Sequence, residues 1–320
     1  MNPPTRSPER SESRELPSDS GLDVVTGAFS YSGSAIARHL RDEGRGVRTL
    51  TGHPGRAAPD GGIEAFPLDF DDPAALAAHL SGATTLYNTY WVRFARGRLD
   101  HEQAVANSRT LFHAARRAGV QRIVHVSITH PTIDSPYPYF RCKALVERSL
   151  AEVGVPYAIL RPAILFGGDG VLINNIAWLL RRLPIFAVGG NGRYRIRAIH
   201  VDDLAGLALE AGRHRRDVIL DAVGPERPTF LELVGEIRAV VGSRARIVKL
   251  PGPMLPVLSA ALGFVLRDVL LTRDEYHAMA DGLADTDGPA TGDTKVSTWL
   301  AEHGDRLGLA YANELRRHFS

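Results

Sequence analysis

Residues 22–40 read LDVVTGAFSYSGSAIARHL, and this stretch decides the fold. A short apolar run stops at Gly27, and a helical pattern begins near Gly33. A helix that starts directly after a strand presents free backbone N–H groups and the positive end of its dipole to whatever lies above the turn. The stretch therefore predicts an anion site, most often for a pyrophosphate. The alternative is a turn that only joins a strand to a helix, since Ser30 stands where the usual fingerprint has its middle glycine.

The composition describes a globular chain without a strong charge. The 320 residues are 44% hydrophobic and 23% charged, enough for one large domain or for two lobes that share a cleft. The formal net charge of +2 gives no electrostatic reason to expect nucleic acid or an anionic membrane as the main partner, so we expect a small-molecule substrate. The single cysteine, Cys142, excludes an internal disulfide and favours a cytoplasmic location.

Two segments bear on targeting and membranes. Residues 1–21 are rich in proline, serine and mixed charge and have no apolar centre, which predicts a flexible tail and not a signal peptide. Residues 250–271 are strongly apolar, but Pro251, Pro253 and Pro256 interrupt the start, and Arg267 and Asp268 interrupt the end. A membrane span needs about 20 uninterrupted apolar residues. A buried or interfacial helix is the favoured interpretation, and peripheral membrane contact is the weaker alternative.

Strand-like and helix-like segments alternate through the first half of the chain. After the opening unit, strands are expected at residues 46–51, 63–69, 83–88, 121–127 and 156–161, and helices at 73–80, 101–118 and 139–153. This alternation predicts parallel βαβ units and a doubly wound α/β fold of the Rossmann type, in which ligands bind at the carboxyl ends of the strands. We place this dinucleotide-binding domain at residues 22–165. Residues 166–320 are expected to form a smaller mixed substrate lobe with a helical C-terminal region, some of whose strands return to the main sheet.

Tyr139 and Lys143 form the second functional signal. Residues four apart lie on one face of a helix, so the ammonium group can approach the phenol. A free tyrosine has a pKa of about 10, and a nearby cation lowers it toward a value useful for acid–base chemistry. Ser127, at the end of the fifth strand, can share a substrate oxygen with Tyr139. Alone, the Tyr–Lys pair also fits a solvated helix face, but its place in this series of βα units favours a catalytic site.

Four segments together resemble a known superfamily. They are TGAFSYSG at residues 26–33, the strand-end Ser127, YFRCK at residues 139–143 and LRPAILFG at residues 160–167. Their order over residues 22–211 is similar to that of the short-chain dehydrogenase/reductases, specifically the extended or atypical branch of NAD(P)-dependent epimerase/dehydratase-like proteins. The resemblance implies that Tyr139 is the acid–base, that Lys143 holds the nicotinamide ribose and tunes Tyr139, and that Ser127 orients the substrate oxygen.

The same resemblance implies a set of cofactor contacts. The residues expected around the pyrophosphate are Gly27, Phe29, Ser30, Tyr31 and Gly33. Those expected beside the adenine, after the fourth strand and near the nicotinamide are Asp69, Phe70, Asn88, Thr89, Tyr90, Arg161, Pro162, Ala163 and Ile164.

The end of the second strand bears on the choice of cofactor. A carboxylate there favours NAD, whereas a basic residue accommodates the 2′-phosphate of NADP. This chain has Thr51 and His53 there, with Arg48 and Arg56 nearby and no acid. We therefore predict NADP over NAD.

Two other segments point to a subgroup. YWVRF at residues 90–94 and GVLINNIAWLLRRLP at residues 170–184 are similar to the NAD(P)-binding accessory subunit of respiratory complex I and to NmrA-like regulators. Some members of these groups bind the cofactor without turnover. Two functions therefore stay open: an oxidoreductase or epimerase working by hydride transfer, and a non-catalytic NAD(P)-binding regulatory or accessory protein.

The remaining polar residues have simpler interpretations. His200, with Asp202 and Asp203, can be a metal or acid–base cluster, but a strand-end histidine followed by an aspartate helix cap is favoured. The other histidines lack ligand spacing, so no metal is predicted. Cys142 is expected to be a small buried apolar residue rather than a nucleophile.

Arginines alternate at residues 193, 195 and 197, which places them on one face of a strand. They can meet an anionic substrate or form a solvated edge, and the edge is slightly favoured.

Overall fold

The computed structural model describes residues 21–55, 62–94, 100–168 and 170–313. Its main feature is a seven-stranded sheet with the strand order β10-β6-β5-β4-β1-β2-β3 and parallel pairing throughout. The strands are β1 (Leu22–Thr26), β2 (Gly46–Thr51), β3 (Glu64–Pro67), β4 (Ala83–Asn88), β5 (Arg122–Val126), β6 (Tyr157–Pro162) and β10 (Val218–Ala222). This arrangement confirms the doubly wound α/β fold. The edge strand β10 comes from the C-terminal half of the chain.

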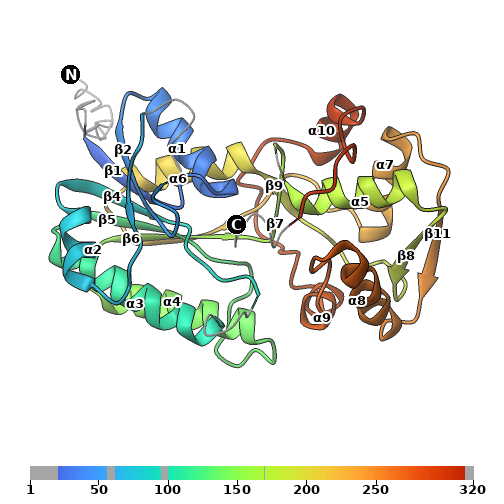
Figure 1. The fold of residues 1–320 in the computed structure, drawn as a ribbon, viewed down its shortest axis with the longest axis horizontal. Helices are drawn as coiled ribbons and strands as arrows, with labels where there is room; N and C mark the ends of the chain where they lie inside the picture. The colour runs from blue at the N-terminus through green and yellow to red at the C-terminus, as the bar shows by residue number, and fades with distance from the viewer. Residues whose placement is uncertain (1–20, 56–61, 95–99, 169, 314–320) are drawn as a thin grey trace, which may run out of the picture.

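Helices cover both faces of this sheet (Figure 1). On one face lie α1 (Tyr31–Asp42) and α6 (Val201–Arg213), and on the other lie α2 (Pro73–Leu80), α3 (His101–Arg117) and α4 (Pro138–Glu152). Since both faces are covered, the central strands are apolar along their length: Val24 and Val25 are fully buried, and every residue of β5 is buried. Cys142, on α4, is buried in the core, as predicted.

The second lobe lies beyond the carboxyl ends of the strands (Figure 1). It contains α5 (Val171–Arg182), α7 (Phe230–Val240), α8 (Met254–Leu266), α9 (Arg273–Ala280) and α10 (Val296–His303), with two small parallel sheets. One sheet pairs β8 (Ile185–Gly189) with β11 (Arg246–Leu250), and the other pairs β7 (Ile164–Phe166) with β9 (Ala198–His200). The lobe has its own apolar core, around Phe166, Val188 and Trp299.

The strand-like stretch at residues 194–200 is shorter than its alternation suggests. Only Ala198–His200 form β9, and Arg195 makes an isolated bridge to Thr229. The next residue, Ile196, donates its backbone N–H to Pro228, outside any sheet. The segment is therefore held by contacts to the loop that precedes α7.

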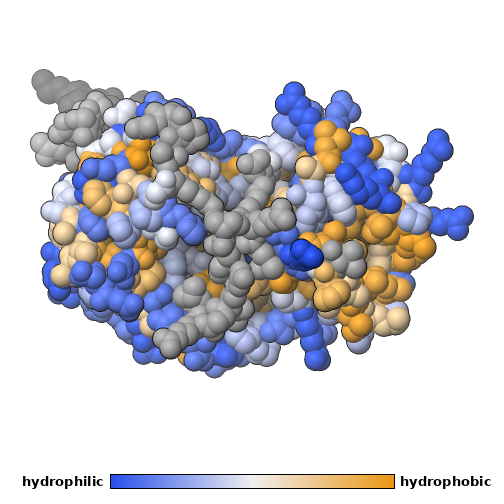
Figure 2. Space-filling view, viewed as in Figure 1, coloured by the Kyte–Doolittle hydropathy of each residue, from blue (hydrophilic) through white to orange (hydrophobic). Residues whose placement is uncertain are grey.

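Helix α8 exposes apolar side chains. Val257 is 71% exposed and Phe264 is 87% exposed, with Met254 and Leu258 about half exposed. Figure 2 shows apolar residues gathered at the end of the molecule where α8 lies. In the part of the chain that the structure describes, no helix is long and apolar enough to cross a membrane.

Asp23 is a buried charge at the centre of the main sheet. Its side chain is 1% exposed, its two oxygens accept from Arg45 Nε and Nη2 at 2.7 and 2.9 Å, and Oδ1 also accepts from the backbone N–H of Thr85 at 3.1 Å. These bonds tie β1 to β4 and to the loop before β2. Removing the carboxylate would leave a guanidinium and a buried N–H without their acceptor.

We expect Asp23→Ala to lower the free energy of unfolding by about 1.5–3 kcal/mol, because the buried Thr85 N–H and the partly exposed Arg45 guanidinium lose their charged acceptor. The matched control is Glu64→Ala on β3, whose pair with Arg48 (3.0 Å) is solvent-exposed. Its loss should cost about 1 kcal/mol or less. Urea unfolding measures both, and equal costs would contradict this account of Asp23.

Candidate functional site

The turn between β1 and α1 is built so that the helix starts very close to the end of the strand. Gly27 has φ +66°, a left-handed conformation that favours glycine. A Cβ on Gly33 would lie 2.1 Å from the carbonyl oxygen of Gly27, so only glycine fits at residue 33. Ser30, the residue before α1, makes no side-chain cap bond within the described residues. The first N–H groups of α1 therefore face outward with the positive helix dipole, as a pyrophosphate requires.

Hydrogen bonds hold the end of β4 against the end of β1. The Thr26 hydroxyl donates to Asn88 Oδ1 (3.1 Å) and accepts from the backbone N–H groups of Thr89 (2.8 Å) and Tyr90 (3.1 Å). The Thr89 hydroxyl donates to the Thr26 carbonyl at 2.6 Å. Three predicted cofactor residues are thereby fixed beside the glycine turn.

A cavity of about 1860 Å³ opens above these strand ends and extends to the second lobe. Ligand pockets usually measure about 300–1,000 Å³, so this one has room for a dinucleotide and a second molecule. Twelve of the predicted site residues line it: Gly27, Phe29, Ser30, Tyr31, Thr51, His53, Phe70, Thr89, Tyr90, Tyr139, Ala163 and Ile164.

Four other predicted residues are not part of the cavity lining: Asp69, Asn88, Arg161 and Pro162. Asp69 accepts from the backbone N–H of Asp71 (3.0 Å), and Asn88 donates its amide to His125 Nδ1 (3.0 Å). Arg161 pairs with Glu147 of α4, and the Pro162 carbonyl accepts from Thr129 N–H (3.1 Å). Arg56 lies outside the described residues.

Tyr139 stands at the cavity wall among aromatic rings. The edges of Trp91 and His101 approach it with ring centroids 5.5 Å away, and Phe140 lies at 5.8 Å. Burial raises the pKa of the Tyr139 phenol above its usual range, while Arg93 acts to lower it and Glu275 to raise it. The phenol is therefore protonated at neutral pH, and it is a proton donor.

Lys143 lies beneath the wall with its side chain 2% exposed. Its ammonium donates to the carbonyl oxygen of Val126 (3.0 Å) and sits 4.4 Å from the centre of the Trp91 ring. Burial lowers the pKa of Lys143 to about 7, against a raising effect of Glu147. One indole ring thus contacts both members of the Tyr–Lys pair.

Three buried polar atoms near this pair have no hydrogen-bond partner among the described residues: Ser127 Oγ, Trp91 Nε1 and His125 Nε2. Such atoms are costly unless something satisfies them. Of the three residues only Trp91 lines the cavity, so its Nε1 is the atom of this set that a ligand in the cavity can reach, while Ser127 and His125 lie beneath the wall.

The sequence interpretation missed several cavity residues. Trp91 and Arg93 belong to the YWVRF segment, which was noted for its family resemblance rather than for a position in the site. Asn107 donates to the Tyr90 hydroxyl at 2.8 Å from α3. The opposite wall comes from residues 269–284, which are too far along the chain for any local pattern to connect with the glycine turn.

The His200 cluster is a helix cap, although the capping residue is the histidine and not an aspartate. His200 Nδ1 accepts from the backbone N–H of Asp202 at 3.2 Å. Asp202 pairs with Arg38, and Asp203 accepts from the backbone N–H and hydroxyl of Thr294 at 2.8 and 2.9 Å. These side chains hold α1 and the segment before α10 against α6.

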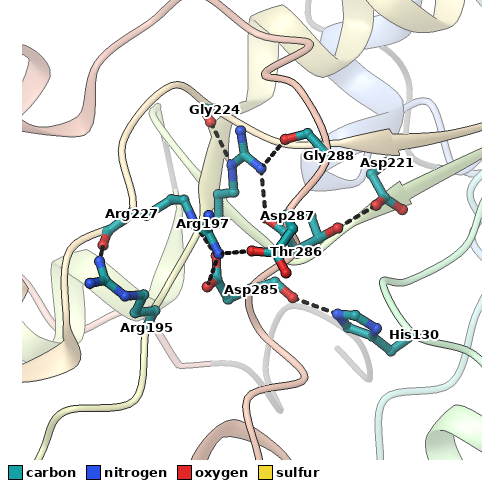
Figure 3. A network of polar contacts seen from close by, with 10 residues as sticks. All are labelled: His130, Arg195, Arg197, Asp221, Gly224, Arg227, Asp285, Thr286, Asp287 and Gly288. Atoms are coloured by element: carbon teal, nitrogen blue, oxygen red, sulfur yellow. Dashed lines mark hydrogen bonds and ion pairs between the residues drawn. The ribbon is translucent and has the colours of Figure 1, made fainter.

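For Arg197, neither alternative considered for the arginine series is right. Arg197 is 5% exposed and donates to the carbonyl oxygens of Gly224 (3.0 Å), Thr286 (2.7 Å) and Gly288 (2.6 Å), as Figure 3 shows. Arg195 donates to the carbonyl of Arg227 (2.8 Å), which itself pairs with Asp285. The alternation predicted that the arginines share one side of the segment. It did not predict that the Arg197 guanidinium donates to loop carbonyls, and not to a ligand or to solvent.

Comparison with known proteins agrees with the geometry. Residues 27–175 match a family described as NAD(P)H-binding. The chain is 23% identical over 214 residues to the mitochondrial NADH dehydrogenase [ubiquinone] 1 alpha subcomplex subunit 9 of Arabidopsis thaliana, covering 64% of this chain and 53% of that protein. It is 24% identical over 246 residues to a 3 beta-hydroxysteroid dehydrogenase/Delta 5-->4-isomerase of Mycobacterium tuberculosis, covering 68% and 66%. The chain thus spans about half to two thirds of these relatives.

The fold also matches solved structures. The triphenylmethane reductase of Citrobacter sp., solved in complex with NADP(H), superposes with a TM-score of 0.72 at 18% identity, covering 88% of this chain and 99% of that one. This likeness supports the Rossmann-type fold. The match to the NAD(P)H-binding family over residues 27–175 and the relatives named above fit the resemblance drawn from the sequence motifs.

We expect Gly33→Ala to abolish NADPH binding, because the added methyl group would collide with the Gly27 carbonyl and push α1 away from the turn. Gly206→Ala is the matched control, since its Cβ would meet no heavy atom within 4 Å on α6. NADPH fluorescence titration measures binding, and circular dichroism checks folding. Normal NADPH affinity in folded Gly33→Ala protein would contradict this role for the turn.

Lys143 should make stability depend on pH. Its folded pKa of about 7 lies below the unfolded value of 10.5, so between these values the unfolded chain binds more protons and stability rises with pH. Relative to Lys143→Met, we expect the free energy of unfolding of the wild type to increase across this window by about 1 kcal/mol per pH unit. Urea unfolding at several pH values measures the difference. A difference that does not change with pH would show that Lys143 is not held neutral by burial.

Proposed function

We propose that this chain is an NAD(P)-dependent oxidoreductase acting on a carbonyl or hydroxyl carbon. The proposal starts from two findings: the chain carries an NAD(P)H-binding domain, and it fits the extended short-chain dehydrogenase/reductase superfamily. One observation carries the proposal. Tyr139 lines the same cavity as the glycine turn of β1 and α1, so a proton donor and a cofactor cradle face one space. Relatives and structural neighbours that are dehydrogenases, reductases and epimerases support it.

The proposed chemistry assigns simple roles to the chain's own residues. The bound dinucleotide supplies or accepts a hydride at the substrate carbon. The first backbone N–H groups of α1 hold its pyrophosphate, and Tyr31 and Thr89 line its path. In the reducing direction Tyr139 donates its proton to the carbonyl oxygen, which receives the electron pair of the broken C=O π bond. Burial keeps this phenol protonated at neutral pH, so Tyr139 is able to donate a proton in the reducing direction.

Ser127 and Lys143 complete the proposed site. The Ser127 hydroxyl, which has no partner among the described residues, would donate to the substrate oxygen. Lys143, whose ammonium lies against the Trp91 ring, would hold the ribose of the cofactor. Because the pKa of Lys143 is lowered to about 7, part of its amine is neutral at pH 7. This reduces the free-energy cost of burying the amine when no cofactor is bound.

NADP is the proposed cofactor. Support comes from the end of β2, where Thr51, Gly52 and His53 line the cavity without a carboxylate that would repel a 2′-phosphate. The His53 backbone N–H donates to the Thr51 hydroxyl (3.2 Å), which turns this segment at the strand end. The proposed cytoplasmic location rests on the single cysteine alone.

The competing proposal is a non-catalytic NAD(P)-binding accessory protein. Similarity to the NADH dehydrogenase alpha subcomplex subunit 9 proteins favours it, and so does the geometry of Lys143, which donates to a backbone carbonyl. Both proposals expect NADPH to bind. Only the first expects turnover that depends on Tyr139.

We expect Tyr139→Phe to lower kcat/KM for carbonyl reduction by about 10²–10⁴-fold, the usual contribution of a positioned acid, while leaving NADPH affinity unchanged. Tyr157→Phe, a tyrosine at the start of β6 outside the main cavity, serves as the control. Turnover of a panel of ketones and aldehydes, followed by NADPH absorbance and repeated with NADH, measures the effect. NADPH binding without Tyr139-dependent turnover across the panel would leave the accessory role, and a preference for NADH would overturn the choice of NADP.

A further inference from the structure

The half of the cavity that faces the second lobe has apolar walls. From the segment after β4 come Val92 and Phe94, and from the opposite side come Leu270, Leu271, Met279 and Leu283. These residues belong to elements that meet only through the tertiary fold. The cofactor half, in contrast, is lined by the glycine turn, Thr51, His53 and Thr89.

The charged residues of the cavity lining are few, and both cations are paired. Among the described lining residues the charged side chains are Arg38, Arg93, Asp202, Asp274 and Glu275, two positive and three negative. Arg93 bonds Glu275 at 3.0 Å, and Arg38 bonds Asp202. The pairing with Glu275 makes Arg93 a weaker receptor for a phosphate group than an unpaired arginine would be. The more exposed Arg38 pair joins α1 to α6.

Within the described parts of the chain, helix N-termini offer no second anion site in this half. Helix α9 begins at the cavity, but a capping box satisfies the N–H groups of Thr272 and Glu275. Asp274 and Glu275 also place negative charge in its first turn, which opposes an anion there. The uncapped start of α5 lies beside Tyr31, since a Cβ on Gly170 would be 2.7 Å from the Tyr31 hydroxyl. That end therefore belongs to the cofactor half.

Resting on the proposed function, we infer that the substrate is an uncharged carbonyl compound with a large apolar skeleton, of ring or long-chain type, and not a nucleotide sugar. Each buried methylene contributes about 0.8 kcal/mol of favourable transfer, and these walls can receive many of them. A nucleoside diphosphate would be desolvated against Asp274 with neither arginine free to pair with it. Several solved structures of the same fold bind UDP-sugars, so the inference separates this chain from them by the chemistry of its cavity.

The inference is tested by binding rather than turnover. Protein saturated with NADP⁺ forms a non-reacting complex with a ketone, so isothermal titration calorimetry can compare 4-androstene-3,17-dione and 2-undecanone with UDP-glucose. We expect at least one ketone to bind at least ten-fold more tightly than UDP-glucose, with a negative heat-capacity change that marks apolar burial.

A matched pair of variants locates the site. Leu271→Gln should weaken ketone binding about ten-fold or more, because it places an amide in the apolar wall. Leu258→Gln changes a leucine that is 48% exposed on α8 and lies outside the cavity lining, so it should change the affinity less than two-fold. Titration with NADP⁺ alone confirms for each variant that the cofactor half is intact.

The outcomes separate the two proposals. Failure of NADP⁺ to bind the wild type would overturn the proposed function itself. With NADP⁺ bound, tighter binding of UDP-glucose, no binding of either ketone, or equal ketone affinity in Leu271→Gln and wild type would each overturn the apolar substrate and leave the NADP-dependent function standing.

Discussion

The contact between residue 33 and the Gly27 carbonyl is the constraint on which the rest of the site depends. It brings the first turn of α1 directly over the end of β1, with no room for a side chain. Because the helix starts so close to the strand, its positive dipole end points into the space above the sheet. The Ser30 side chain does not cap the helix. The hydroxyl of Thr26 then fixes β4 beside this turn, so that Thr89 and Tyr90 reach the same space.

The second lobe converts this open crevice into a cavity. It is held to the sheet domain by the Arg93–Glu275 pair and by the Thr129 hydroxyl, which donates to the Leu283 carbonyl at 2.7 Å. These bonds consume polar groups that would otherwise face a ligand. The cavity surface that remains beside the second lobe is mostly apolar, and for this reason the proposed substrate is apolar and uncharged.

Beneath the cavity lies a small set of buried ionisable groups in a low-dielectric setting. His125 is fully buried, and both burial and the nearby Lys143 charge lower its pKa, so it is neutral and accepts from Asn88. Lys143 has a lowered pKa for the same main reason, and Tyr139 a raised one. Burial thus favours the uncharged form of all three, and the site is arranged around proton donors and acceptors more than around fixed charges.

The sequence by itself determined the fold class, and it proposed the residues of the cofactor half of the site. Glycine positions, strand-end residues and the alternation of strands with helices are local properties. Gly27 and Tyr139, named from such patterns, and Thr89 and Ile164, named from the family resemblance, line one cavity in the structure. Local patterns also placed Arg197 on one side of its segment and His200 at a strand end. They did not predict that Arg197 donates to loop carbonyls or that His200 accepts from a helix N–H. Only the tertiary structure decided the wall formed by residues 269–284, the pairing of Arg93 with Glu275 and the position of Trp91 over Lys143. These contacts join residues up to 182 positions apart, and no periodicity along the chain encodes which distant side chains will meet.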